Sequence, residues 1–362
     1  MSLFSFFAYE SPKRRKKMRR SRFFLALSFA VVMPLALSAA TWSEPSPNSE
    51  QVVFFSGGTI DDGLTFILLT TMDEANLQGV VVTNADCIAD LAMELQWKIS
   101  SYTQSTEIPV SLSDARGWNP FPWSYRADCI RFSNVEALKS YGANPQWPPY
   151  PSGDELIEEL LTRAIANDTP LTMLVTCPVT ALSNVLAKNP KLAQGIERMI
   201  FMGGAIDVPG NLDPETIPKE IASSGGEWNI FWDPVSTEWI FNNTSFPIIL
   251  FPLDVTNQAK LAPLMPRLRE KSLEFAYSKL AYEGYELTGD EPYYCMWNVV
   301  TSCYIPHPEF FGEPVRMNLE VVTEGNEQGD VVRKSSGREV EVILSLKEPD
   351  QYYDYVLKQL AQ

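Results

Sequence analysis

Hydrophobic residues in this 362-residue chain form short apolar runs that alternate with amphipathic stretches. The runs predict buried strands at 52–55, 77–83, 108–112, 171–176, 199–202 and 248–252. Between them, apolar residues at helical spacing predict helices at 61–72, 87–103, 154–167, 180–188 and 233–242. This alternation predicts an α/β fold with a mostly parallel central sheet and helices on both faces.

The pattern changes over the last third of the chain. Two helical stretches, at about 262–282 and 293–304, precede strands near 319–323 and 340–346 and a closing helix that begins at Asp350. No internal repeat and no low-complexity linker interrupts the sequence. We therefore expect a single domain over residues 41–362, after a separate N-terminal segment.

Residues 1–40 have the organisation of a secretory signal peptide. Arg19, Arg20 and Arg22 precede an apolar run at 23–37, and small residues follow at 38–40. The apolar run is shorter than a bilayer span, which favours cleavage over anchoring. We therefore expect an exported protein, periplasmic or extracellular, with no membrane attachment after cleavage. Translation from Met18 is an alternative start.

Charge and cysteine content narrow the functional classes. Residues 1–40 hold eight basic residues and one acidic residue, so the remainder has 21 basic and 44 acidic residues and a formal charge of −23. Such a surface repels phosphate backbones, so we expect no nucleic-acid partner. The five cysteines show no CxxC spacing, which excludes the common zinc and redox motifs.

The most informative stretch is the glycine-rich turn that follows the first predicted strand. Gly57 and Gly58 lead into a helix that opens with the adjacent acids Asp61 and Asp62. One acid in a first helical turn serves as a cap or complements the helix dipole. Two together, at the carboxyl end of a parallel strand, also fit a site for a metal ion or a polyol.

Polar residues also follow the other predicted strands. They are Asn84 and Asp86 after the second, Thr176 and Thr180 after the fourth, Asn211 after the fifth, and Asp254 and Thr256 after the sixth. Each alone reads as a turn or a cap. Because the carboxyl ends of parallel strands share one edge of the sheet, together they predict a site there.

The ordered segments resemble the calcium-dependent nucleoside hydrolases of the inosine/uridine-preferring family. The resemblance runs from about Val52 to the C-terminus, with segments at 55–62, 82–84, 175–180, 200–205, 210–211, 227–234, 252–256 and 296–298. The Glu227-Trp228-Asn229 segment, followed by Asp233-Pro234, is the most specific of them. The resemblance implies hydrolysis of the N-glycosidic bond of a ribonucleoside, a small-molecule substrate, to ribose and free base.

The resemblance also implies roles for single residues. Asp62, the Thr176 carbonyl and Asn298 would hold calcium, and Asp61 would hydrogen-bond the ribose. The ribose hydroxyls would be bound by Asn84, Asn211, Glu227 and Asn229. Asn84 and Asn211 also fit plain turn chemistry, and Glu227 and Asn229 also fit a cap before the helix at Asp233. Family members are often oligomers, so a homo-oligomer is a further implication.

The chain departs from the family at its metal site. Gly57 stands where the family has the acid expected to act as base and calcium ligand, Phe55 replaces another acid, and Asn298 replaces a late Asp. Two lost carboxylates predict weak or absent calcium binding. Asp61, Asp86 or an acid of the insertion between Asn211 and Glu227 (Asp213, Glu215 or Glu220) would then serve as base.

Two hypotheses follow from these departures. The first is an exported nucleoside hydrolase in which another acid replaces the missing base. The second is a catalytically impaired family member that binds nucleoside, ribose or a protein partner.

Overall fold

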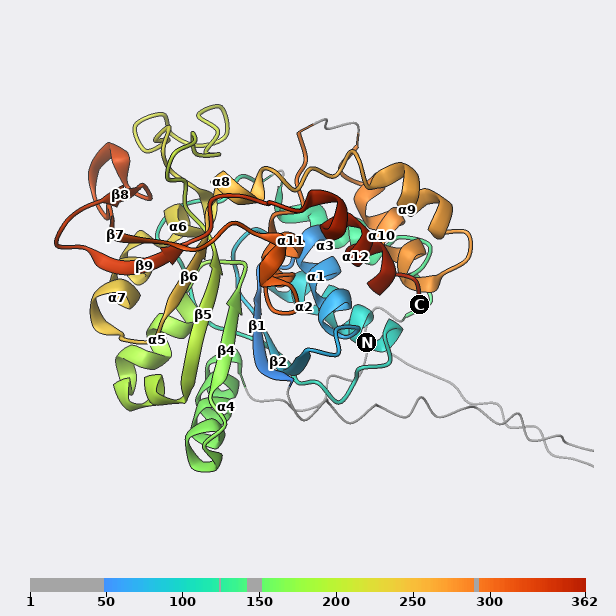
Figure 1. The fold of residues 1–362 in the computed structure, drawn as a ribbon, viewed down its shortest axis with the longest axis horizontal. Helices are drawn as coiled ribbons and strands as arrows, with labels where there is room; N and C mark the ends of the chain where they lie inside the picture. The colour runs from blue at the N-terminus through green and yellow to red at the C-terminus, as the bar shows by residue number, and fades with distance from the viewer. Residues whose placement is uncertain (1–48, 124, 142–151, 290–292) are drawn as a thin grey trace, which may run out of the picture. The chain divides into compact units, whose positions relative to one another are not determined.

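The computed structural model describes residues 49–123, 125–141, 152–289 and 293–362, which carry a nine-stranded sheet (Figure 1). The strands are β1 (Glu50–Ser56), β2 (Ala75–Val82), β3 (Val110–Leu112), β4 (Leu171–Val175), β5 (Ile196–Met202), β6 (Ile248–Phe251), β7 (Val315–Val321), β8 (Val331–Arg333) and β9 (Arg338–Val342). Their spatial order is β3-β2-β1-β4-β5-β6-β9-β7-β8. Along this spatial order, each neighbouring pair from β3 as far as β9 is parallel. Strand β7 runs antiparallel to both β8 and β9. The predicted signal segment, 1–40, lies outside the described residues.

The strand order reverses between β1 and β4. From β1 the chain moves outward to β2 and β3, then returns to place β4 on the other side of β1. In open α/β sheets, the crevice at the carboxyl ends of the strands at such a reversal is where ligands bind. Residues that follow β1 and β4 are therefore brought together at the expected position of a site.

Helices cover both faces of the sheet, as the sequence predicts. One face carries α1 (Ile60–Leu69), α2 (Ala89–Tyr102), α3 (Asp128–Ser133), α9 (Met265–Lys271), α10 (Ala276–Glu286), α11 (Trp297–Ser302) and α12 (Pro349–Gln359). The other carries α4 (Gly153–Asn167), α5 (Thr180–Lys188) and α7 (Pro234–Asn243). The short helices α6 (Trp228–Trp232) and α8 (Leu253–Thr256) follow β5 and β6 in the chain.

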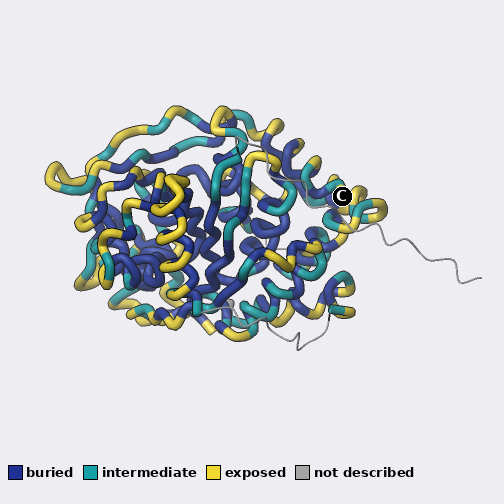
Figure 2. The backbone as a smooth tube through the Cα atoms, turned by 90° about the horizontal axis from the view of Figure 1, so that it is seen from below, coloured by how far each residue is buried: buried dark blue, intermediate teal, exposed yellow. Residues whose placement is uncertain are grey.

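The central strands contribute to two separate hydrophobic cores. On β1, Val52 and Phe54 pack into one core while Val53 and Phe55 pack into the other. This follows from the two-residue period of a strand, which points successive side chains to opposite faces. Because both faces are covered, the inner parts of the central strands are apolar and buried, as at 52–55, 80–82 and 199–202. Figure 2 shows buried residues through the middle of the molecule.

The C-terminal third differs from the sequence prediction in three places. The stretch at 262–282 is two helices, α9 and α10, because Phe275 has extended backbone dihedrals. The stretch at 293–304 is helical only from Trp297 to Ser302, since Cys295 instead forms a β-bridge with Lys260. The three-residue strand β8 was not predicted, because so short a run carries little periodicity.

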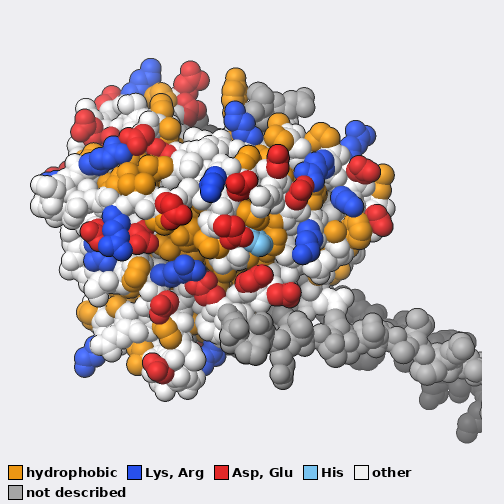
Figure 3. Space-filling view, in the orientation of Figure 1, with side chains coloured by type: hydrophobic (Ala, Val, Ile, Leu, Met, Phe, Trp, Pro, Cys, Tyr) orange, Lys and Arg blue, Asp and Glu red, His pale blue; other side chains and the backbone are white. Residues whose placement is uncertain are grey.

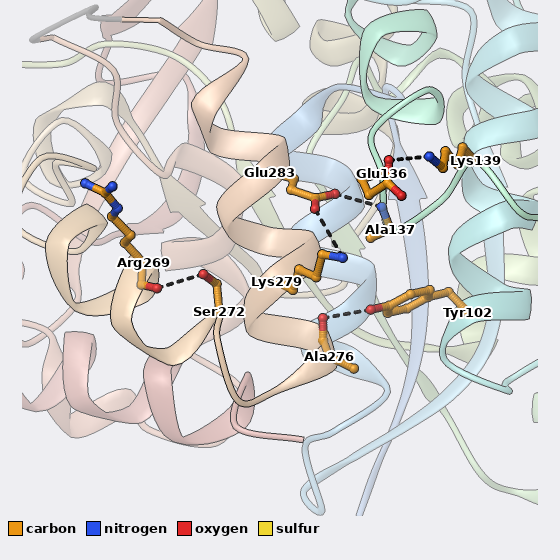
Figure 4. Close-up of polar contacts among 9 residues, drawn as sticks. All are labelled: Tyr102, Glu136, Ala137, Lys139, Arg269, Ser272, Ala276, Lys279 and Glu283. Carbon is orange, nitrogen blue, oxygen red and sulfur yellow. Dashed lines mark hydrogen bonds and ion pairs between the residues drawn. The ribbon is translucent and has the colours of Figure 1, made fainter.

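Helix α10 is fixed to the α2–α3 region by polar contacts (Figure 4). The Tyr102 hydroxyl donates to the Ala276 carbonyl at 2.8 Å, and the Ala137 amide donates to Glu283 Oε2 at 2.8 Å. Lys279 lies 3.7 Å from the other oxygen of Glu283. These contacts set the position of Tyr285, one turn beyond Ala281 on the same helix, which reaches the site described below.

The surface charges and the cysteines of the described residues are consistent with the fold described above. Acidic and basic side chains both occur across the face in Figure 3. Within the described part of the chain, no helix is long and apolar enough to cross a bilayer. All five cysteines are buried and carry free thiols.

Gly58 offers a test of the turn that connects β1 to α1. Its φ is +81°, and a Cβ built there would lie 2.3 Å from the Ala92 Cβ. Gly58→Ala should therefore lower the free energy of unfolding by about 2–5 kcal/mol, from left-handed strain plus overpacking. Gly325 has a φ of +79° with nothing within 4 Å, so Gly325→Ala should cost only the strain, about 1–2 kcal/mol. Urea unfolding of both variants checks this, and equal losses would contradict the packing argument.

Candidate functional site

A pocket of about 240 Å³ opens at the carboxyl end of the sheet, at the reversal between β1 and β4. Its acidic lining residues are Asp61, Asp86, Asp128 and Glu227. Neutral polar residues line it at Thr59, Thr176, Asn211, Asn229 and Asn298, and Met202, Trp228, Tyr294 and Trp297 supply apolar surface. The pocket thus combines carboxylates and amides with an aromatic wall.

Asp62 is fully buried and is not among the described lining residues, but it contacts three of them, Thr59, Thr176 and Asn298. Its Oδ2 accepts hydrogen bonds from the Thr59 amide and hydroxyl, both at 2.9 Å, while Thr59 Oγ1 caps the Asp62 amide. Its Oδ1 accepts from Thr176 Oγ1 at 2.6 Å and from Asn298 Nδ2 at 3.1 Å. The capping box of α1 therefore aims one carboxylate oxygen at β4 and α11.

Asp61 is buried beside it but points toward the C-terminal helices. Its Oδ1 accepts from the Tyr285 hydroxyl at 2.6 Å, and its Oδ2 accepts from the amides of Asn298 at 2.5 Å and Val299 at 3.3 Å. These amides belong to the first turn of α11, so Asp61 caps a helix that is distant in sequence. One carboxylate thereby fixes the helix that carries Asn298.

The three residues predicted to hold calcium come together. Thr176, Asn298 and Asp62 share the contacts at Asp62 Oδ1, and the Thr176 carbonyl faces Asn229 Nδ2 at 3.4 Å. Rotation of the Asn298 amide would turn its oxygen toward Asp62, since the two orientations have nearly the same shape. These oxygens fit the preference of calcium for oxygen ligands. Among the residues described, no group of three or more His, Cys, Asp or Glu side chains is arranged to hold a metal.

Glu227 and Asn211 also lie where they were expected, at the pocket. The Glu227 carboxylate accepts from the amides of Gly204 at 2.9 Å, Asn229 at 3.0 Å and Ile230 at 3.3 Å. It therefore caps α6 and ties it to the end of β5, whereas Asp233 caps α7. Asn211 Oδ1 accepts from the Trp228 amide at 3.2 Å.

Of the two polar residues expected at the site after β2, only Asp86 lines the pocket. Asn84 is not among the lining residues described; its Oδ1 accepts from Arg126 at 3.2 Å. Asp86, two residues later, lines the pocket instead. The acids of the insertion, Asp213, Glu215 and Glu220, are likewise absent from its described lining.

The acids at the site have pKa values raised above the usual range of carboxyl groups. Burial raises the pKa of Asp61 to about 7, that of Asp62 to about 6 and that of Glu227 to about 7. Burial, reinforced by the charges of Asp62, Glu227 and Asp128, raises the pKa of Asp86 well above its usual range, against a smaller lowering by Arg126. Crowded acids of this kind favour binding of a proton or a cation.

Sequence reasoning missed Asp128, Tyr285 and Tyr294 at the site. Asp128 and Tyr294 line the pocket, and Tyr285 supports Asp61. Asp128 opens the six-residue helix α3, which has too few residues for a clear periodic signal. No local pattern distinguishes Tyr285 from the other aromatic residues of α10.

Comparison with known proteins shows which family this sequence matches. The sequence profile described as inosine-uridine preferring nucleoside hydrolase matches residues 53–353. The pyrimidine-specific ribonucleoside hydrolase RihA of Klebsiella pneumoniae (strain 342) is 25% identical over 205 residues, which cover 56% of this chain and 60% of the relative. RihA of Shewanella sp. (strain ANA-3) is 33% identical over 201 residues, which cover 56% and 58%. The chain thus spans about three-fifths of the length of these curated relatives.

Solved structures share the fold over most of the chain. The inosine-uridine preferring nucleoside hydrolase from Bacillus anthracis superposes with a TM-score of 0.77 at 27% identity, covering 86% of this chain and 99% of that one. A plant nucleoside hydrolase, at a TM-score of 0.70 and 15% identity, shares the fold. On the profile match and the shared fold, the chain belongs to the inosine-uridine preferring nucleoside hydrolase family.

Proposed function

We propose that this chain is an exported, calcium-dependent nucleoside hydrolase that cleaves the N-glycosidic bond of ribonucleosides to ribose and free base. The observation that carries the proposal is the pocket at the β1–β4 reversal, where Asp62, Thr176 and Asn298 meet beneath an aromatic wall. The family membership supports the same reaction class. The substrate is a small molecule, consistent with the volume of the pocket.

The two sides of the pocket suit the two halves of a nucleoside. Asn211, Asn229 and the carboxylates present donors and acceptors to the ribose hydroxyls. Tyr294 and Trp297, whose rings meet edge to face at 4.9 Å, offer apolar surface to the planar base. Trp297 is held by a hydrogen bond from Nε1 to Asn257 Oδ1 at 2.9 Å, so this surface is fixed before the substrate arrives.

The charge of the pocket suits the reaction. Cleavage of a glycosidic bond passes through an oxocarbenium-like transition state, in which positive charge develops on the sugar. Asp61, Asp86, Asp128 and Glu227 line the space where the sugar would lie, and Asp62 lies behind Thr176 and Asn298. Negative charge held there in advance stabilises that state.

Asp62, the Thr176 carbonyl and the Asn298 side chain would hold calcium. When bound, the ion would supply a polarised water and contacts for the ribose hydroxyls. With fewer carboxylates than a tight site, affinity should lie toward the weak end of calcium sites, at about 10⁻⁴–10⁻³ M.

Ribose release in calcium and in chelator tests the function directly. We expect the domain from residue 41 onward to release ribose from inosine, uridine, adenosine or guanosine in millimolar calcium. Excess chelator should abolish release because the water loses its polarising ion. Asp62→Asn should lower the rate by about 10²–10⁴-fold. A folded protein that releases no ribose, yet is stabilised by nucleosides, would instead support the impaired, nucleoside-binding alternative.

The buried acids predict how pH acts on stability. The pKa values of Asp61 and Glu227, at about 7, and of Asp62, at about 6, exceed those of exposed carboxyls, so the unfolded chain loses these protons first as pH rises. In chelator, the free energy of unfolding should therefore fall as pH rises from about 4 through about 7.

Calcium should oppose this loss. Because the ion would bind the deprotonated Asp62 carboxylate, whose pKa is raised to about 6, the calcium-induced rise in melting temperature should be larger at pH 8 than at pH 5. Melting curves at both pH values, with calcium and with chelator, provide the measurement. An equal rise at both pH values would show that the Asp62 carboxylate does not hold the ion.

Export gives a separate test. The chain recovered from an exporting host should lack residues 1–40 by intact mass, because the small residues at 38–40 end the predicted signal. A mass that still contains the arginines of 19–22 would contradict cleavage at this place.

A further inference from the structure

We propose that Asp86 supplies the acid that is missing at Gly57, reaching the same place in the pocket from the loop after β2. The inference rests on the proposed function and assigns its base. It follows from four observations on the position of Asp86, the glycine beneath it, the loop that carries it and the freedom of its carboxylate.

The Asp86 carboxylate occupies the space that a side chain at position 57 would take. A Cβ built on Gly57 would lie 2.9 Å from Asp86 Oδ2, 3.2 Å from Asp62 Oδ2 and 3.5 Å from the Cys177 Cβ. The first distance is too short for a real contact. The space beside Asp62 can therefore hold either an acidic side chain at position 57 or the Asp86 side chain, but not both.

The backbone does not require glycine at position 57. Positive φ values occur among the described glycines at Gly58, Gly204, Gly289, Gly325 and Gly329, and Gly57 is not one of them. Its lack of a side chain is thus explained by space and not by conformation. The neighbour that needs this space is the Asp86 carboxylate.

Hydrogen bonds hold the loop of Asp86 against the end of β1. The Thr83 amide donates to the Ser56 carbonyl at 2.9 Å, and the Cys87 amide donates to the Gly57 carbonyl at 3.4 Å. On the outer side of the loop, the Arg126 guanidinium donates hydrogen bonds to the Ala85 carbonyl at 3.3 Å and to Asn84 Oδ1 at 3.2 Å. Residue 86 is thereby fixed opposite Gly57.

The Asp86 carboxylate is also available for chemistry. Those of Asp61 and Glu227 each accept three backbone or side-chain hydrogen bonds that hold helices in place. None of the described residues donates a hydrogen bond to the carboxylate of Asp86, which is half-buried and faces the pocket. It can therefore accept a proton from a bound water or add negative charge beside Asp62.

The step is a hydrolysis that balances without a further reactant. The water oxygen bonds to C1′ of the ribose, and one water proton passes to the Asp86 carboxylate. The electron pair of the C1′–N bond leaves with the base, which takes up a proton from solvent. Asp86 then returns its proton to solvent, so nucleoside and water give ribose and free base.

Exchange of the two positions provides the test. We expect Asp86→Ala to lower ribose release by about 10²–10⁴-fold and to weaken calcium binding, measured by calorimetry, by at least about tenfold. Gly57→Asp alone should also weaken both, since two carboxylates would compete for one volume. The double variant Gly57→Asp with Asp86→Ala should recover at least about tenfold over either single variant. Asp90→Ala, the same change at an exposed position four residues on, is the control and should behave as the wild type.

Each outcome has a distinct meaning. If Asp86→Ala keeps both calcium affinity and turnover within about threefold of the wild type, this proposal is wrong and the hydrolase stands. If the double variant is as poor as the singles, the exchange of position is wrong. If the folded wild type neither binds calcium nor releases ribose, the proposed function fails and this inference with it. Should Asp86→Ala not fold, the isosteric Asp86→Asn gives the same comparison, and calcium affinity distinguishes lost charge from lost structure.

Discussion

The burial of two adjacent carboxylates after β1 is the constraint on which the site depends. A buried carboxylate is costly unless hydrogen bonds and opposite charge compensate it. Asp61 is compensated by Tyr285 and by the first turn of α11, and Asp62 by Thr59, Thr176 and Asn298. The partners come from α1, β4, α10 and α11. The pair thus ties the start of α1 to elements more than 200 residues later in the chain.

Asp61 and Asp62 also explain why the pocket favours binding of a cation. Its donors are neutral hydroxyls and amides, so hydrogen bonding is supplied but charge is not. Glu227, Asp86 and Asp128 add acids to the same small space, where Arg126 is a cation close enough to lower the pKa of Asp86. Without a metal ion, burial favours the protonated, uncharged forms of these acids, as the raised pKa values of Asp61, Asp62 and Glu227 indicate. A divalent cation would replace those protons and leave the carboxylates charged.

Much of this arrangement could be predicted from the sequence, because strand and helix periods and turn residues are local signals. Strands β1 to β6 and helices on both faces follow from such signals. The gathering of Asp62, Thr176 and Asn298 was instead implied by the family resemblance. Tyr285 and Asp128 could not be found this way, since their roles depend on tertiary contacts with residues far along the chain. The break between α9 and α10 was missed for the same reason: the apolar residues on either side keep helical spacing while the backbone at Phe275 is extended.

The loop after β2 shows how a local motif can mislead about single residues. The family resemblance implies that Asn84 binds the ribose, yet Arg126 holds its side chain and Asp86 faces the pocket. Compared with the family position by position, Gly57 indicates that an acid has been lost. In the structure, however, the Asp86 carboxylate, on the loop after the neighbouring strand β2, fills the space that a side chain at position 57 would take. Parallel strands make such an exchange feasible, because the residues after β1 and β2 end at one edge and can deliver a side chain to the same point. A missing motif residue therefore argues for lost chemistry only when no neighbouring loop can reach its place, and here one does.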